Sequence, residues 1–391
     1  MNEISGEFNN ERNWKVLFGV NSLKKLPLEI ERYGCKRVLL VTTKSVSQSS
    51  AAEKVKEVLG SMLTDVYAGS KQNSPLSSVY KGLEIMEEKQ VDALVSLGGG
   101  SNVDVAKGMI MAYAYGDLNK LLGKVIREKS DVYYSYERIK HIRKPVPLFA
   151  IPTTLSGAEF TYQAGLTDTN TGRKDQYYAR DVLAKSIILD PEMTLDTPQE
   201  LWLSSGVKAI DHGVERLYSR THHPFSDVIQ LGALRLLFPN LRQSRNDPSD
   251  LNSRNNLLYA SWMVQFCTMN VHVGVGHAID HQICGYYNIS HGIAASVMLP
   301  NVMRFNRDAA TNELSEMAKV ISGGSTAEDA IKETRNLIDY LGLPTRLRDI
   351  GVKERDFDIL AERALIDTAI AGNPKPVNSK DEIIEILRSA W

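Results

Sequence analysis

Cysteine is scarce in this chain of 391 residues, which contains only Cys35, Cys267 and Cys284. Three thiols, odd in number and far apart in the sequence, form neither a disulfide framework nor the paired CxxC spacing of a zinc knuckle. We therefore expect free, mostly buried thiols in a reducing cytoplasm.

Long apolar runs and an excess of one charge are also missing. No stretch approaches the roughly 18 apolar residues that a membrane-spanning helix needs, and the polar start MNEISGEFNN lacks the pattern of a signal peptide. The net charge of −1 gives no attraction to nucleic acid or to an anionic membrane. We expect a cytoplasmic homodimer that acts on a small molecule, with neither nucleic acid nor membrane as partner.

Strand and helix patterns alternate through the first half of the chain. Short apolar or β-branched runs predict strands, and apolar residues at helical spacing predict helices. The strands are expected at 37–43, 64–70, 92–100, 146–154 and 185–192, and the helices at 49–63, 77–90 and 101–115. This alternation predicts a parallel sheet with helices on both faces.

Helical periodicity dominates after about residue 195. Helices are expected at 199–219, 225–241, 254–269, 312–322, 327–342 and 379–391, with a polar loop at 242–256. The length of the chain allows two cores. We therefore predict an α/β domain over residues 1–195 and an all-α domain over residues 196–391.

The sequence GGGSNVDVAK at 98–107 follows an expected strand and opens an expected helix. Glycines let backbone N–H groups approach a phosphate, and the helix N-terminus favours an anion. This indicates a phosphate site, although a tight turn without a ligand fits the same residues. The segment PTTLSGAEFT at 152–161 follows another strand, where open sheets bind ligands. A polar loop explains that segment equally well.

Histidines cluster in the helical half. His277 and His281 are four residues apart and share a helix face, His291 follows, and His212 lies on another expected helix. Two helices that present such groups can build a metal site, although hydrogen-bonded core histidines are the alternative. Lys208, one turn before His212, argues against a metal because an ammonium repels a divalent cation. Asp211 points away from His212 on the helix wheel.

The order of these motifs, with SGVKAIDHGVE at 205–215 and GHAIDHQICGYYNISHG at 276–292, resembles the iron-dependent (group III) alcohol dehydrogenases. The resemblance runs from residue 15 to residue 377. It implies the fold shared with dehydroquinate synthase: a Rossmann-like N-terminal domain, a helical C-terminal domain, and a nicotinamide cofactor between them.

The resemblance also implies roles for single residues. The cofactor pyrophosphate would lie on Gly98, Gly99, Gly100 and Ser101, with Asp104 in the same motif and with Thr153 and Thr154 near the adenosine. The metal ligands of the family would fall on positions Lys208, His212, His277 and His291, and His281 matches a histidine of the substrate pocket. An aspartate is expected at the first of these positions, where the sequence has Lys208.

Two departures from the family pattern refine the expectation. PTTLSGAEFT is one residue short, as in the maleylacetate reductase branch, which also lacks the aspartate ligand and works without metal. The acid that would bind the NAD ribose is replaced by Thr43, followed by Lys44, which favours NADP or the use of both cofactors. A surface lysine is the alternative explanation for Lys44.

We therefore predict an NAD(P)-dependent oxidoreductase that acts on a small alcohol or carbonyl, or on a hydroxy or keto acid, without a divalent metal. Lys208 would bind a substrate carboxylate, or act as acid and base with a pKa lowered by burial and nearby histidines. His277 and His281 would relay protons. The basic segment 173–185 could recognise an acid or be a solvated loop.

Four alternatives stay open. They are an iron- or zinc-dependent alcohol dehydrogenase in which Asp211 replaces the missing ligand, enoate reduction as by maleylacetate reductase, oxidative decarboxylation of a β-hydroxy acid, and a non-catalytic complex subunit.

Overall fold

The computed structural model describes residues 15–128, 131–135, 139–169 and 173–391, and the chain divides into two compact units. The α/β unit ends at Pro198 and the helical unit begins at Gln199, while the described residues of 127–133 group with the helical unit. No helix within the described residues is long and apolar enough to cross a membrane.

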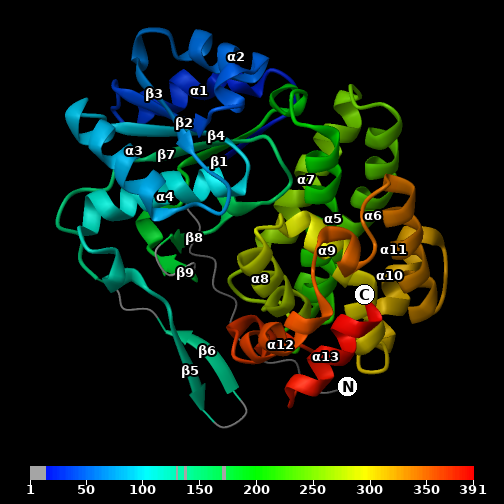
Figure 1. Cartoon of the computed structure of the whole chain (residues 1–391). Coiled ribbons are helices and arrows are strands. Elements are labelled where there is room, and N and C mark those ends of the chain that lie inside the picture. Colours follow the sequence, from blue (N-terminus) through cyan, green and yellow to red (C-terminus); the bar gives the residue numbers. More distant parts are fainter. Residues whose placement is uncertain (1–14, 129–130, 136–138, 170–172) are drawn as a thin grey trace. The chain divides into compact units, whose positions relative to one another are not determined.

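The centre of the α/β unit is a parallel six-stranded sheet in the order β1-β10-β7-β4-β2-β3 (Figure 1). Its strands are β1 (Lys15–Phe18), β2 (Val38–Thr43), β3 (Leu63–Ser70), β4 (Ala93–Gly98), β7 (Leu148–Pro152) and β10 (Ser186–Leu189). The register places Gly98 beside Pro152. The turns that follow β4 and β7 therefore lie next to each other at the carboxyl edge of the sheet.

Helices cover both faces of this sheet, as the strand and helix alternation predicts (Figure 1). They are α1 (Leu26–Arg32), α2 (Ser50–Leu59), α3 (Leu76–Glu88) and α4 (Gly100–Tyr115). Helices α1 and α2 share an apolar core with alternate residues of the strands, such as Val38, Leu40 and Val95. Each fully buried side chain of this kind contributes roughly 1.5–3 kcal/mol.

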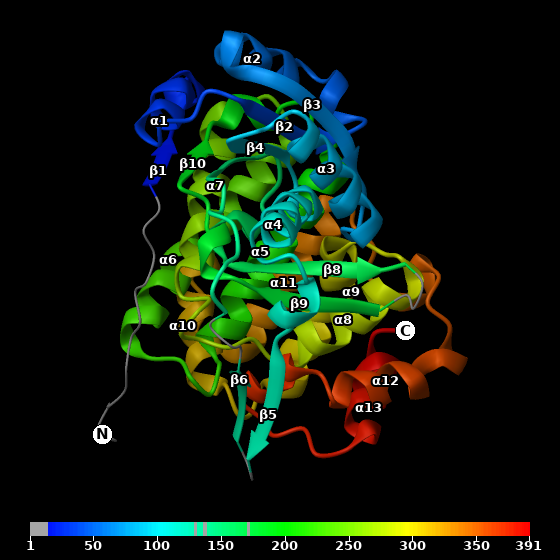
Figure 2. The same cartoon turned by 90° about the vertical axis from the view of Figure 1, so that its left-hand side faces the viewer.

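Two hairpins were not expected from the sequence. One consists of β5 (Lys124–Glu128) and β6 (Asp131–Ser135), and the other of β8 (Gln163–Asp168) and β9 (Arg173–Tyr178). Figure 2 shows β8 and β9 side by side. The interpretation of 173–185 as a solvated loop is therefore wrong for its first residues, which pair with β8.

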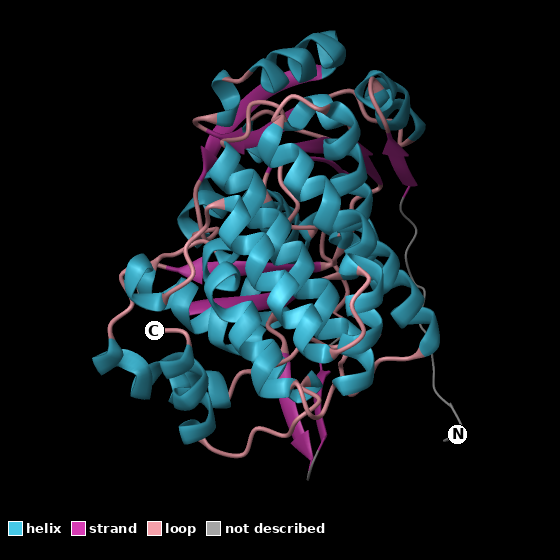
Figure 3. Cartoon of the chain, turned by 90° about the vertical axis from the view of Figure 1, so that its right-hand side faces the viewer, coloured by secondary structure: helices cyan, strands magenta, loops and turns pink. Residues whose placement is uncertain are grey.

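The second unit consists mainly of helices (Figure 3). They are α5 (Gln199–Leu217), α6 (Pro224–Asn246), α7 (Leu251–Phe266), α8 (Val275–Tyr287), α9 (His291–Asn306), α10 (Thr311–Ser322), α11 (Ala327–Leu341), α12 (Phe357–Leu365) and α13 (Lys380–Ser389). Residues of α8, α9, α12 and α13 form one continuous apolar core.

The expected polar loop at 242–256 is wrong. Helix α6 continues to Asn246, and α7 begins at Leu251, where the Asp250 carboxylate accepts the N–H groups of Asn252 and Ser253. The polar residues of this segment cap or flank two helices: Arg242, for example, reaches Glu333 at 2.5 Å. The polar residues of this segment belong to the ends of two helices and to a short turn, and composition alone does not distinguish these from a loop.

A close helix contact positions one of the predicted histidines. A Cβ at Gly292 would lie 2.5 Å from the backbone carbonyl of Ser204, so only glycine allows α9 to start this near α5. His291, the first residue of α9, is thereby fixed beside the helix that carries Lys208 and His212.

Candidate active site

In the α/β unit, the turn between β4 and α4 is held close to the loop after β7. Gly98 has φ +155°, and a Cβ at Gly99 or Gly100 would lie 3.1 Å from Thr154 or 3.0 Å from Ser156 Oγ. Side chains larger than hydrogen would fill this space. The first N–H groups of α4, which have no partner within the helix, can therefore reach an anion such as a phosphate.

The other predicted cofactor residues near this turn have protein partners. Ser101 Oγ accepts the N–H of Asn73 at 3.2 Å, and the Asp104 carboxylate accepts the N–H of Gly165 at 3.2 Å. Burial raises the pKa of Asp104. Thr153 and Thr154 are both buried at the end of β7. These residues hold the neighbouring loops in place around the turn.

Thr43 and Lys44 lie at the carboxyl end of β2, one strand away from β4 in the sheet. Thr43 Oγ1 accepts the N–H of Val46 at 3.2 Å, while the Lys44 side chain is exposed. No acidic residue occurs between positions 43 and 52. The end of this strand therefore carries no negative side chain.

Sequence reasoning missed a buried pair of ionisable groups behind the turn. Lys107 Nζ donates to the carbonyls of Ala158 and Gln163 at 2.6 and 2.9 Å and to Thr161 Oγ1 at 3.0 Å. Burial lowers the pKa of Lys107 to about 8 and raises that of Glu159 to about 7. This lysine ties α4 to the segment between β7 and β8.

In the helical unit, α5 carries Lys208, whose ammonium is buried and paired. Its Nζ donates to Asp211 Oδ2 at 2.7 Å and to Asp280 Oδ2 at 2.8 Å. Burial alone would lower the pKa of Lys208, but these two carboxylates raise it above the usual value. The expected lowering of this pKa is therefore wrong, because the sequence did not reveal that Asp280 would lie opposite.

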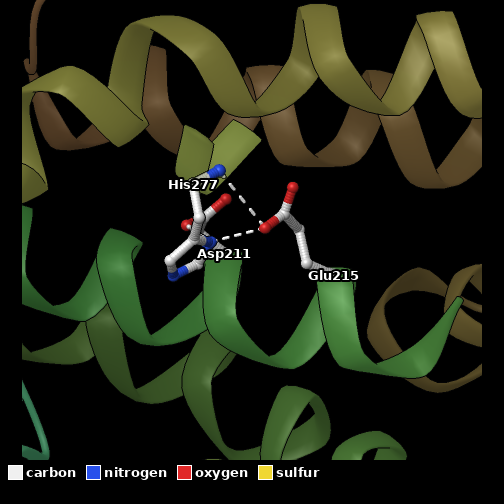
Figure 4. A group of neighbouring side chains, drawn as sticks. All are labelled: Asp211, Glu215 and His277. Atoms are coloured by element: carbon white, nitrogen blue, oxygen red, sulfur yellow. Dashed lines mark hydrogen bonds and ion pairs between the residues drawn. The ribbon is translucent and has the colours of Figure 1, made fainter. Parts of the chain in front are cut away.

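His277 faces carboxylates of α5, as Figure 4 shows for Asp211 and Glu215. Its Nδ1 is bonded to Glu215 Oε2 and lies 3.3 Å from Asp211 Oδ2. Glu215 also accepts the N–H groups of Gly274 and Gly276 at the start of α8, where the helix dipole favours an anion. Ligand atoms of Asp211, Glu215 and His277 lie within 4.8 Å of one another.

His212 lies against His277, with 4.8 Å between ring centroids, and its Nδ1 is 3.1 Å from Gln265 Nε2 of α7. Burial, and then the charges of neighbouring basic groups, hold the pKa values of His212 and His277 well below the usual value. Both imidazoles are therefore neutral near pH 7.

His281 is held by an aspartate from a distant part of the sequence. Its Nδ1 lies 3.0 Å from Asp367 Oδ2, and Asp367 Oδ1 accepts the N–H of Ala369 at 2.9 Å. Although burial would raise the pKa of Asp367, the nearby histidine and the hydrogen bonds lower it. The ring of His281 also lies 6.3 Å from that of His277 and 5.9 Å from that of His291.

The structure thus brings all five predicted catalytic residues together within the helical unit, and it adds four partners that the sequence analysis did not assign: Glu215, Gln265, Asp280 and Asp367. Glu215 and Asp280 could have been found, because they are one turn from Asp211 and His277 on the same helices. Gln265 and Asp367 come from other elements, and no local pattern marks them.

Both halves of the chain match known protein families. The family model "Iron-containing alcohol dehydrogenase" matches residues 13–191, and "Fe-containing alcohol dehydrogenase family, C-terminal" matches residues 202–391. A 1,3-propanediol dehydrogenase from Citrobacter freundii is 34% identical over 96% of each chain.

Solved structures give the same result. One of a 1,3-propanediol oxidoreductase is 31% identical, covers 96% of this chain and 98% of its own, and superposes with a TM-score of 0.88. A maleylacetate reductase from Rhizobium sp. is 25% identical, covers 99% of both chains and has a TM-score of 0.79. The chain therefore belongs to the iron-containing alcohol dehydrogenase family, whose members are oxidoreductases, and it shares features of the maleylacetate reductases.

Proposed function

We propose that the chain is an NAD(P)-dependent oxidoreductase that interconverts a small alcohol and its carbonyl compound without a bound divalent metal. The observation that carries this proposal is the pairing of the Lys208 ammonium with two buried carboxylates, at 2.7 and 2.8 Å. In this arrangement a side chain of the protein supplies a positive charge at the position where the family pattern has a metal ligand.

The residues at the family's metal positions do not fit a divalent ion. Lys208 has no free lone pair and brings its own positive charge. Asp211 cannot replace the missing ligand freely, because it already accepts from Lys208. Glu215 is occupied by backbone N–H groups of α8. His277 is oriented by carboxylates in the way that metal-bound histidines usually are, whereas His212 Nδ1 faces the amide of Gln265.

A nicotinamide cofactor does fit the α/β unit. The glycines of the β4–α4 turn leave room for a pyrophosphate at the N-terminus of a sixteen-residue helix. When bound, the cofactor supplies or accepts hydride. Lys44 and the absence of an acid at positions 43–52 support NADP as well as NAD, because an exposed lysine can attract a 2′-phosphate.

An uncharged alcohol or aldehyde is the substrate class that this site favours. Lys208 is already neutralised by Asp211 and Asp280, so the positive charge that could attract a carboxylate is engaged within the protein. The engaged charge of Lys208 therefore argues against a carboxylic acid as the substrate and against oxidative decarboxylation as the reaction. The relatives named for 1,3-propanediol are consistent with a neutral substrate.

Proton movement is assigned to His281. The Asp367 carboxylate holds the Nδ1–H of this histidine, which leaves Nε2 to exchange a proton with the substrate oxygen. The carboxylate fixes the orientation of the ring and stabilises the charged form during transfer, as in other histidine and aspartate pairs.

Metal analysis combined with activity tests the proposal. Purified protein is dialysed against a chelator, its iron and zinc are measured by mass spectrometry, and reduction of small aldehydes is followed with NADH and with NADPH. We expect unchanged activity and no stoichiometric metal. Lys208→Asp should lose activity, whereas Lys332→Asp, at an exposed position of α11, should keep it. Stoichiometric metal that is required for wild-type activity would contradict the proposal.

A further inference from the structure

The amide of Gln265 has a defined orientation in the helical unit. Its Oε1 accepts from Thr268 Oγ1 at 2.6 Å and from an Arg216 guanidinium nitrogen at 3.4 Å. A guanidinium has donors only, so the amide oxygen must face Arg216. The amide nitrogen, which can only donate, is then the atom that lies 3.1 Å from His212 Nδ1.

This orientation fixes the tautomer of His212. Because Nδ1 accepts a hydrogen bond from the amide, the neutral imidazole carries its proton on Nε2. Metal-bound histidines show the opposite pattern, since the ring nitrogen that does not bind the metal donates to a carboxylate or carbonyl. His277 follows that pattern with Glu215, so the two neighbouring rings are held in opposite ways.

The supports of Gln265 are themselves buried and bonded. Arg216 also donates to the carbonyl of Val264 at 2.9 Å, and both Arg216 and Gln265 are 3% exposed. An amide flip would place the NH2 group of Gln265 against the donors of Arg216 and leave His212 beside an oxygen. The surroundings of Gln265 therefore disfavour the reversed orientation, which would favour metal binding.

We propose that Gln265 is a positioning residue that converts His212 from a metal ligand into a hydrogen-bond donor, and that the His212 Nε2–H binds the reacting oxygen of an uncharged alcohol or aldehyde. The inference rests on the proposed function. In the reducing direction, the carbonyl carbon takes hydride from the reduced nicotinamide, which becomes oxidised. The carbonyl oxygen takes one proton through His281, and His212 keeps its own proton throughout.

A fixed N–H donor suits this role. Negative charge grows on the oxygen as hydride arrives at the carbon, and a preoriented donor in a water-poor site stabilises that charge. A neutral imidazole can donate without carrying a charge that must first be desolvated. Gln265 touches neither substrate nor cofactor in this proposal and acts through the ring of His212.

The test exchanges the amide for a carboxylate. Gln265→Glu keeps the shape and still accepts from Arg216 and Thr268, but its second oxygen accepts from His212, so the histidine proton should move to Nδ1. Nitrogen-15 spectra of labelled histidine report the tautomer directly. We expect His212 to be protonated on Nε2 in the wild type and on Nδ1 in the variant, with kcat lower on the order of 100-fold and an unchanged dissociation constant for NADPH.

Metal binding provides a second readout that does not depend on activity. The double variant with Lys208→Asp and Gln265→Glu should bind one zinc ion tightly, and Lys208→Asp alone should bind it at least tenfold more weakly. Gln265→Met, which neither donates nor accepts, serves as the control for packing and should release His212 to a mixture of tautomers.

The outcomes separate this inference from the proposed function. A wild-type His212 that is protonated on Nδ1 in a metal-free, active enzyme would overturn the role of Gln265 and leave the proposed function intact. Stoichiometric metal required for wild-type activity would overturn the proposed function, whatever the tautomer.

Discussion

Two buried lysines of this chain have pKa values shifted in opposite directions, and their partners explain the difference. The Lys107 ammonium bonds carbonyl and hydroxyl oxygens, so the cost of burial outweighs the nearby charges of Asp104 and Glu159 and the pKa of Lys107 falls to about 8. Lys208 bonds two carboxylates, and its pKa rises. Burial of a lysine therefore does not by itself predict a lowered pKa, because carboxylates that bond the ammonium directly reverse the direction of the shift.

The environment of Glu159 predicts how stability depends on pH. Burial raises its pKa from 4.5 in the unfolded chain to about 7 in the folded one, and its Oε2 has no partner among the described residues. The folded state therefore holds this proton more tightly. The stability that results is complete below pH 4.5 and is lost as the pH rises through about 7.

We expect Glu159→Gln, which resembles the protonated carboxyl, to remove this loss. The melting temperatures of wild type and variant should agree near pH 5. By pH 8.5 the wild type should melt at a lower temperature, because its free energy of unfolding is then smaller by on the order of 1–3 kcal/mol. Glu57→Gln, at an exposed position of α2, is the control and should follow the wild type. Parallel curves for wild type and Glu159→Gln would show that Glu159 is not titrating in this range.

The candidate site could be predicted from the sequence only in part. Motif order identified Lys208 and the four histidines, because they keep fixed spacings along helices. The role of Lys208 depended on Asp280, which is 72 positions away, and that of His281 on Asp367, which is 86 positions away. Such partners are set by how α5, α8 and the segment after α12 pack, and no local pattern records that packing.

At the scale of secondary structure elements, the end of α3 is strained. Gln90 follows the C-cap residue Lys89 and has φ +49°, a left-handed conformation in which a Cβ is unfavourable. Its N–H donates to the carbonyl of Glu87, and its own carbonyl accepts from Arg37. Both contacts use backbone atoms of Gln90, so glycine would keep them.

Gln90→Gly should therefore raise the free energy of unfolding by about 0.5–1 kcal/mol, less the greater entropy of glycine in the unfolded chain. Urea unfolding followed by circular dichroism measures the change. Gly34 is the matched control, because it follows α1 with φ +72° and no atom lies within 4 Å of the position that a Cβ would take. Gly34→Ala should lower stability by a similar amount. If Gln90→Ala raises the free energy of unfolding as much as Gln90→Gly does, backbone strain at this position is not the cause.

Helices and buried parallel strands were predicted better than hairpins. An amphipathic helix such as α11 shows its apolar spacing within one segment, and a central strand such as β7 is apolar throughout. Strand β9 has the sequence RKDQYY, which is typical of a polar loop until its partner β8 is known. The same limit explains the extension of α6 through polar residues to Asn246.

For the whole chain, the alternation of strands and helices, followed by helices alone, was enough to predict an α/β unit and a helical unit. The helical unit starts at Gln199, where α5 begins, since residues 191–194 still form a short 3-10 turn that packs with the α/β unit. Family membership then follows from matches that cover residues 13–191 and 202–391. Within the set of metal-ligand positions that the family pattern implies, the sequence departs at one side chain, Lys208.

The three buried thiols can serve as built-in probes of unfolding, because each becomes reactive only when it is exposed. Cys35 belongs to the α/β unit, and Cys267 and Cys284 belong to the helical unit; their exposed fractions are 6%, 0% and 2%. Burial also raises the pKa of Cys35 to about 11, so little thiolate is present at neutral pH. Alkylating reagents should therefore leave the folded chain unmodified.

When the chain is warmed in such a reagent, each cysteine should be modified only as its own unit opens. Mass spectrometry of the peptides would then give separate opening rates for the two halves of one molecule. Modification of any of the three within minutes at 25 °C, at the rate of a free thiol, would contradict their burial. If modification is slow, the rate at each cysteine reports how often its own unit opens, and no added label is needed.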